Sequence, residues 1–202
     1  QGAIPAGVYL KYVSAGYDHT CAIASNNQTY CWGGNQYGQL GNGTNNNASV
    51  PMAIAQGAIP AGVYLTQIQS AGSFTCGLGS NGWVYCWGQN HGGQLGNGTN
   101  HNKLVPTQIL QGAIPNGVLI KQISASGNIH SCALATNNQA YCWGNGDNGK
   151  LGDGNTSGHN SLVPTQVLQG TIPVGLAINT IGTGNNHSCA LASNNWVYCW
   201  GN

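Results

Sequence analysis

Cysteine is the residue type with the clearest chemistry in this chain of 202 residues, because its eight copies form four pairs, each spaced by ten residues. The pairs are Cys21 and Cys31, Cys76 and Cys86, Cys132 and Cys142, and Cys189 and Cys199. Paired thiols form disulfides or bind metals such as zinc. Zinc is disfavoured, since no Cys-x-x-Cys occurs and each pair would need two further ligands from distant segments.

Three histidines lie two residues before the first cysteine of a pair, at His19, His130 and His187. Imidazole is a common metal ligand, so a ring of such side chains could bind a metal. The remaining pair has Phe74 at this position, and phenylalanine cannot bind a metal. We therefore interpret the position as structural, with the side chain packed inside its own repeat. The other histidines follow no pattern: His91, His101 and His159.

The segment Asp153-Gly-Asn155-Thr-Ser157 resembles the start of a calcium-binding loop, in which oxygen ligands alternate along the chain. The acidic residue that closes such a loop is absent, because Pro164 stands at its twelfth position, and Asp147 is the only other carboxylate nearby. The equivalent segments elsewhere read Gly-Asn-Gly-Thr, so we interpret this one as a variant turn. We predict no metal and no cofactor.

Charge is nearly absent: the chain has four lysines, three aspartates, no arginine and no glutamate, and 3% of its residues are charged. A nucleic-acid interface needs clustered cations, so none is expected. Catalysis by paired carboxylates lacks the residues it needs, and no nucleophile elbow or phosphate loop occurs, so we predict that the chain is not an enzyme.

No apolar run approaches the roughly 18 residues that span a membrane. Without an initiator methionine or signal peptide, the sequence is expected to be a mature or trimmed product.

A repeat of 55 to 58 residues positions all these side chains. The segment QGAIPAGVYL occurs at Gln1 and Gln56, with variants at Gln111 and Gln169; YCWG and QLGNGT, or close variants, recur at matching places. We predict a single array of units 1–55, 56–110, 111–168 and 169–202, of which the last is incomplete.

Within a unit the pattern is that of short strands. Residues 8–13 are rich in β-branched and aromatic types, and strands at 20–24 and 29–32 flank a turn in which Asn27 suits a left-handed conformation. A Gly- and Asn-rich loop follows, and Pro51 is expected to start a further short strand. Three to four antiparallel strands per unit predict an all-β protein of propeller-type blades.

The pattern SAGYDHTCAIASNNQTYCWGGNQYGQLGNGT, at residues 14–44, closely resembles the repeat of the regulator of chromosome condensation family. The resemblance extends over all four units and implies a seven-bladed β-propeller. Two departures stand out: there are too few repeats to close such a wheel, and every unit carries a cysteine pair. The family's nucleotide-exchange activity on a nuclear GTPase requires a reducing compartment and a charged face, and neither fits this chain.

The repeat restricts the cysteine pairing to one bridge per unit, because each pair flanks the same hairpin turn. Closing a loop of about 11 residues contributes a little under 3 kcal/mol in the chain-entropy model. Persistent disulfides require an oxidising compartment, so we predict an extracellular or cell-surface protein.

Six Asn-x-Ser/Thr sequons could carry glycans in a secreted eukaryotic protein. They lie at Asn27, Asn42, Asn47, Asn97, Asn155 and Asn186. The tryptophans at one repeat position are expected to form the aromatic core between blades: Trp32, Trp87, Trp143 and Trp200. Trp83 and Trp196 are the better candidates for exposed stacking residues.

Two non-enzymatic functions remain open. The first is a structural or cell-surface protein, such as a filament subunit or an adhesin segment; the second is a secreted binding module, such as a lectin or a protein inhibitor. Repeat arrays need polar caps or ring closure at their ends, and neither is visible here. We therefore expect self-association through the repeat ends or membership of a larger propeller, with glycans or another protein as further partners.

Overall fold

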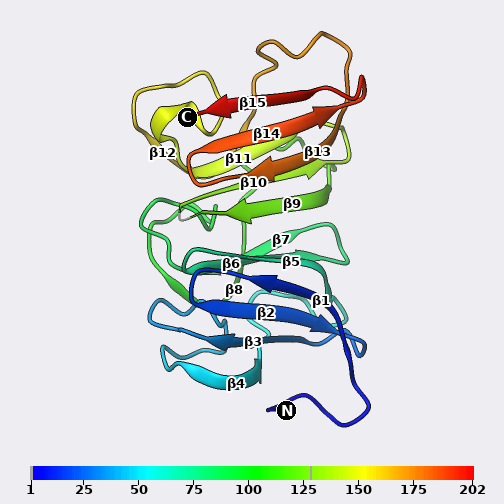
Figure 1. Ribbon diagram of the computed structural model, residues 1–202, viewed down its shortest axis with the longest axis vertical. Helices are drawn as coiled ribbons and strands as arrows, with labels where there is room; N and C mark the ends of the chain where they lie inside the picture. The colour runs from blue at the N-terminus through cyan, green and yellow to red at the C-terminus, as the bar shows by residue number, and fades with distance from the viewer. Residues whose placement is uncertain (1, 128) are drawn as a thin grey trace.

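The computed structural model describes residues 2–127 and 129–202; Gln1, the first residue of the first repeat, lies outside the described residues. The described chain is all-β, apart from one short 3-10 turn, η1, at Asp147–Gly149. Four antiparallel sheets follow one another along the long axis, from the N-terminus at one end to the C-terminus at the other (Figure 1). The predicted propeller-type architecture is confirmed.

Each sheet is a blade made of consecutive strands. Blade 1 contains β1 (Leu10–Ala15), β2 (His19–Ala24), β3 (Thr29–Gly33) and β4 (Ala48–Ala53). Blade 2 contains β5 (Leu65–Ala71), β6 (Phe74–Gly79), β7 (Val84–Gly88) and β8 (Lys103–Gln108). Blade 3 contains β9 (Ile120–Ser126), β10 (His130–Ala135), β11 (Ala140–Asn145) and β12 (Asn160–Gln166). Blade 4 contains β13 (Ile178–Thr183), β14 (His187–Ala192) and β15 (Val197–Gly201).

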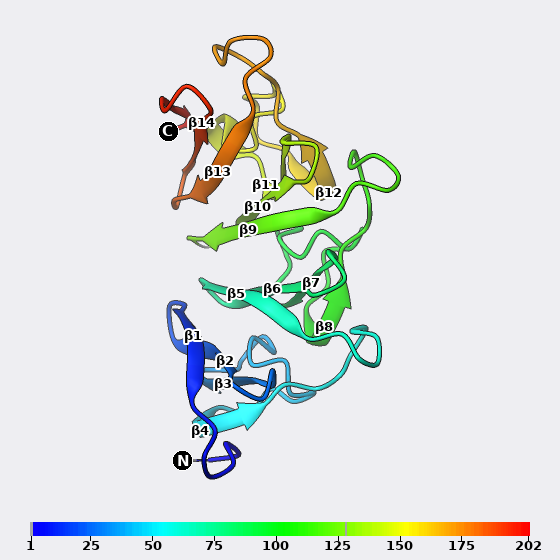
Figure 2. The same ribbon diagram turned by 90° about the vertical axis from the view of Figure 1, so that its right-hand side faces the viewer.

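The blades are arranged as an arc, with their first strands on its inner side (Figure 2). Neighbouring first strands contact one another: β1 with β5, β5 with β9, and β9 with β13. The hydrophobic core lies at the contacts between blades, which we call seams. At the first seam, for example, Ile23 and Leu40 of blade 1 pack against Ile68 and Trp87 of blade 2. Fully burying one such side chain contributes about 1.5–3 kcal/mol, so the seams hold the array together.

The central hairpin of each blade has the predicted left-handed turn residue. The φ angles are 64° at Asn27, 76° at Gly82, 62° at Asn138 and 65° at Asn195. The fourth strand was predicted to start at Pro51, but β4 already begins at Ala48, so this boundary was wrong. β4 is the outer strand of its sheet, and an edge strand tolerates a proline because one side of it needs no ladder bond.

Candidate functional site

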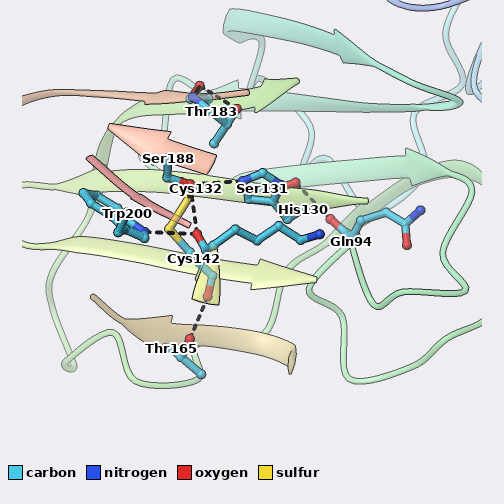
Figure 3. Close-up of a disulfide and its surroundings, with 11 residues drawn as sticks. Gln94, His130, Ser131, Cys132, Cys142, Thr165, Thr183, Ser188 and Trp200 are labelled. Carbon is cyan, nitrogen blue, oxygen red and sulfur yellow. Dashed lines mark hydrogen bonds between the residues drawn. A yellow bond between two sulfur atoms is a disulfide. The ribbon is translucent and has the colours of Figure 1, made fainter. Parts of the chain in front are cut away.

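The four predicted disulfides lie at the centre of the four hairpins. In each pair the two cysteines are directly opposite across the strands, with Cα atoms 4.1 Å apart. The described chain contains no free cysteine, and the sulfurs are bonded to each other instead of being open to zinc. One disulfide per repeat is therefore confirmed. The bridge also borders the seam: Cys132 Sγ lies 3.6 Å from Ser188 Oγ of the next blade (Figure 3).

A main-chain carbonyl joins each blade to the next one. The Gln39 carbonyl accepts hydrogen bonds from Trp87 Nε1 and Thr75 Oγ1 of blade 2, both at 2.9 Å. The Gln94 carbonyl accepts from Trp143 Nε1 at 2.9 Å and Ser131 Oγ at 3.1 Å. The Lys150 carbonyl accepts from Trp200 Nε1 and Ser188 Oγ, both at 3.0 Å. Three of the four repeat tryptophans, Trp87, Trp143 and Trp200, thus bond and pack at a seam as predicted, whereas Trp32 is half-buried and joins none of these three seams.

Two of the three histidines before the cysteines, His19 and His130, belong to the same joint. His19 Nε2 lies 2.8 Å from Thr75 Oγ1, and His130 Nε2 lies 3.0 Å from Ser188 Oγ. The prediction that they pack inside their own repeat was wrong, because their partners come from the next blade. Each hydroxyl already donates its only proton to a carbonyl, so the imidazole must donate from Nε2. Phe74 occupies the equivalent place in blade 2 and is fully buried.

Burial keeps these two imidazoles neutral. It lowers the pKa of His19 to about 4, although the nearby Asp18 carboxylate works in the opposite direction. Burial also lowers the pKa of His130 to about 4, and the positive charge of Lys150 adds to this effect. The Nδ1 atoms of both rings are enclosed and have no hydrogen-bond partner. Taking a charged ring out of water costs more than these surroundings return, even at His19, whose Nδ1 lies 3.7 Å from Asp18 Oδ1, so the charged form is disfavoured.

Glutamine side chains connect the inner strands of neighbouring blades. Gln67 of β5 accepts from Ile123 N at 3.1 Å and donates to Lys121 O at 3.0 Å, both on β9. Gln122 of β9 accepts from the N–H of Ile181 on β13 and donates to the carbonyl of the same residue, at 3.2 Å each. The side-chain amide thereby satisfies backbone groups on the edge strand of the next sheet, as the backbone of a neighbouring strand would. The sequence analysis missed these glutamines; their shared repeat position was the available signal.

The loop that resembled a calcium site contains a different interaction. Asp153 Oδ2 lies 2.8 Å from His159 Nε2, and the Asn155 N–H donates to Asp153 Oδ1 at 3.1 Å. Partial burial raises the pKa of Asp153, but the hydrogen bonds from Asn155 and His159 outweigh this and hold it below its usual value. Within residues 2–127 and 129–202, no three His, Cys, Asp or Glu side chains gather as a metal site would require. His187 was predicted to pack inside its repeat as well, and this was wrong, because the side chain is exposed on blade 4.

The sequon asparagines differ in accessibility. Four are exposed: Asn27, Asn47, Asn155 and Asn186. Asn42 and Asn97 are half-buried in the repeated turn, and the Nδ2 atom of Asn97 is enclosed without a hydrogen-bond partner.

Among the tryptophans proposed for stacking, Trp196 is 70% exposed, whereas Trp83 packs against the core of the first seam. Of the described residues, no helical segment has the length and apolarity needed to cross a bilayer.

This succession of antiparallel blades joined through Trp, His and carbonyl contacts defines a β-propeller repeat protein. The model of the regulator of chromosome condensation (RCC1) repeat matches residues 26–78, 81–134 and 137–191. The chain therefore belongs to the RCC1 repeat family, as its sequence pattern indicated. Each matched segment starts in the hairpin turn of one blade and ends in or beside the second strand of the next, so it includes a seam.

Three relatives illustrate the relationship. The ultraviolet-B receptor UVR8 of Arabidopsis thaliana is 30% identical over 195 residues, which are 96% of this chain and 42% of UVR8. The structure of human WBSCR16 superposes with a TM-score of 0.83 at 21% identity, over 96% of this chain and 47% of that one. Prp20p of Saccharomyces cerevisiae gives a TM-score of 0.71 at 25% identity, over 94% of this chain and 44% of Prp20p. The chain thus spans less than half of each.

Proposed function

We propose that this protein acts outside the cell as a non-enzymatic structural array that associates with further blades through its end faces. Its membership of the RCC1 repeat family is compatible with protein binding: Prp20p, for example, is described by its binding to Gsp1p and histones. The partner proposed for this chain is different, because its own seams define a surface that fits another blade.

The single observation that carries the proposal is the face of blade 1. Thr20 and Trp32 occupy the repeat positions that Thr75 and Trp87 use to bind the carbonyl of Gln39. Both are half-buried, and the indole Nε1 of Trp32 has no hydrogen-bond partner among the described residues. Among the described residues the donors on this face meet no acceptor, so the face matches the acceptor side of a further blade.

Two features support the extracellular and non-enzymatic parts of the proposal. One disulfide in every blade suits an oxidising compartment, where such bonds persist. The groups that could otherwise do chemistry are occupied: the described thiols are bonded, and the buried His19 and His130 are used in seams. The near absence of charge also removes the repulsion that would oppose close association of copies.

Light scattering of the purified chain after size-exclusion chromatography, with electron microscopy of the same fractions, tests the proposal. We expect particles larger than one chain, whose mass increases with concentration. Trp32→Ala should shift the material toward single chains because it removes the seam donor and its apolar contact. Trp196→Ala is the matched control, since Trp196 is exposed and lies outside the seam position. A wild-type chain that stays monomeric at every concentration would contradict the proposal.

A further inference from the structure

Two pockets lie at equivalent places in the first and third seams, each with a volume of about 260 Å³. Each pocket lies between the hairpin turn of one blade and the segment that leads into the next blade. Asn27 and Tyr64 line the first pocket, and Asn138 and Ala177 line the second at the same repeat positions. We call them the Tyr64 pocket and the Ala177 pocket. Both are formed inside the array, between blades that contact each other.

An amide group at the rim of each pocket is held by a lysine. Lys11 Nζ donates to Asn27 Oδ1 at 3.0 Å, and Lys121 Nζ donates to Asn138 Oδ1 at 2.6 Å. The Nδ2 atoms of Asn27 and Asn138 have no hydrogen-bond partner among the described residues, so their N–H groups are available to a ligand. Gln28, which is exposed next to Asn27, adds a second amide to the rim of the Tyr64 pocket.

An aliphatic floor and one aromatic ring complete the Tyr64 pocket. Ile59 is buried, and Ile54 and Val63 pack against the core of the first seam. The Tyr64 side chain is 43% exposed. Its N–H donates to Ser80 Oγ at 3.4 Å, and its carbonyl accepts from the Ser80 N–H at 2.8 Å. Both main-chain groups of Tyr64 are therefore fixed, which holds the ring beside the pocket before a ligand arrives.

The middle seam lacks this combination, although it is built from the same repeat. Gly82 stands at the position of Asn27, so the rim amide is absent. Leu119 stands at the position of Tyr64 and lies over this glycine: a Cβ atom on Gly82 would come within 2.9 Å of Leu119 Cβ. The Ile120 N–H also donates to the Gly82 carbonyl at 3.0 Å. Among the seams of the described chain, the amide rim and the tyrosine occur together only at the first.

We infer that the Tyr64 pocket binds one ring of a neutral saccharide. A sugar ring has an apolar face of C–H groups, which packs on an aromatic ring, and hydroxyl groups that both donate and accept hydrogen bonds. Tyr64 supplies the ring, and the amides of Asn27 and Gln28 supply the polar partners. No carboxylate lines the pocket, and the nearby Lys11 is already bonded to Asn27, so an uncharged ligand fits. This binding site goes beyond the proposed association, because it does not lie on an end face.

The Ala177 pocket is a comparison site within the same molecule. It has the same volume and the same asparagine held by a lysine, but an alanine stands where the Tyr64 pocket has its ring. It should therefore bind the saccharide roughly tenfold more weakly, because the aromatic contact is missing.

The test begins with an array of neutral and acidic oligosaccharides, which is probed with the labelled whole chain. Because Asn27 begins a sequon, the sample is first shown by mass to carry no glycan there. The neutral oligosaccharide that binds best is then titrated into the chain and followed by isothermal titration calorimetry. We expect one saturable site per chain. Absence of a neutral binder on the array, or binding of acidic oligosaccharides alone, overturns the inference.

Three variants locate the binding. Tyr64→Ala should weaken it roughly tenfold or more, whereas Tyr17→Ala, which removes a tyrosine that is 87% exposed and lines neither pocket, should leave it unchanged. Ala177→Tyr should create a second site of comparable affinity, and a single site in this variant overturns the role of the ring. Equal effects of Tyr64→Ala and Tyr17→Ala would count against the Tyr64 pocket. Light scattering on the same samples separates the two proposals: a monomeric chain that binds the saccharide retains this inference while the proposed association fails.

Discussion

Replacing His19 by phenylalanine should make the stability of the first seam less sensitive to acid. Blade 2 already has Phe74 at this position, fully buried, so the aromatic ring fits the fold. At neutral pH the variant loses the hydrogen bond between His19 Nε2 and Thr75 Oγ1. A neutral hydrogen bond of this kind contributes about 1 kcal/mol, and Thr75 keeps its bond to the Gln39 carbonyl. We therefore expect His19→Phe to be about 1 kcal/mol less stable than the wild type near pH 7.

The difference in stability between the variant and the wild type changes sign in acid, because the pKa of His19 differs between the folded and the unfolded state. An unfolded histidine takes up its proton near pH 6.5, whereas the buried ring does so only near pH 4. Between these values the unfolded state binds more protons, so stability falls as the pH falls, by about 1.4 kcal/mol per pH unit. Over this span His19 accounts for a loss of about 3 kcal/mol, and His130 for a similar loss. The variant should become the more stable protein slightly below about pH 6.

Guanidinium chloride unfolding measured by tryptophan fluorescence, with the disulfides intact, gives the free energy of unfolding at each pH. The curves of the wild type and His19→Phe should cross, and a variant with both His19 and His130 replaced should show a still flatter dependence. His101→Phe, on an exposed loop, is the control for adding a phenylalanine. Parallel curves for wild type and His19→Phe between about pH 7 and about pH 4.5 would refute the assignment of a neutral, buried imidazole.

Replacing Cys76 and Cys86 by alanine should lower the free energy of unfolding by about 2–3 kcal/mol, because the unfolded chain gains the entropy of an open loop; denaturation curves with and without reductant measure this. Peptide mass mapping without reduction should recover one bridge within each blade and none between blades. Gly96→Ala should destabilise the protein more than Gly117→Ala. Both glycines have a positive φ, +64° and +78°, but only at Gly96 would the new Cβ meet a neighbouring atom, Trp143 Nε1 at 2.7 Å; thermal unfolding compares the two variants. Gel-shift assays should detect no DNA binding of the kind that steeply weakens as salt is added, because the chain has only four lysines and no arginine to contact phosphates.

Local features were the part that could be predicted from the sequence. The hairpin around Asn27 follows from alternating residues and a turn residue that tolerates positive φ, and both operate within a few residues of each other. The pairing of Cys21 with Cys31 follows from the same hairpin, since the turn puts the two residues opposite each other. The number of blades follows from the repeat, because similar segments fold into similar units.

The tertiary structure decided which groups meet across the seams. His19 finds its partner 56 residues away in Thr75, and Gln67 reaches the backbone of Lys121 at a separation of 54 residues. A repeat pattern shows that such residues recur, but it does not show whether a side chain turns into its own blade or toward the next one. That choice depends on how neighbouring sheets pack and which buried polar groups then need partners. The sequence by itself therefore determined the blade and its disulfide, whereas packing determined the joint between blades.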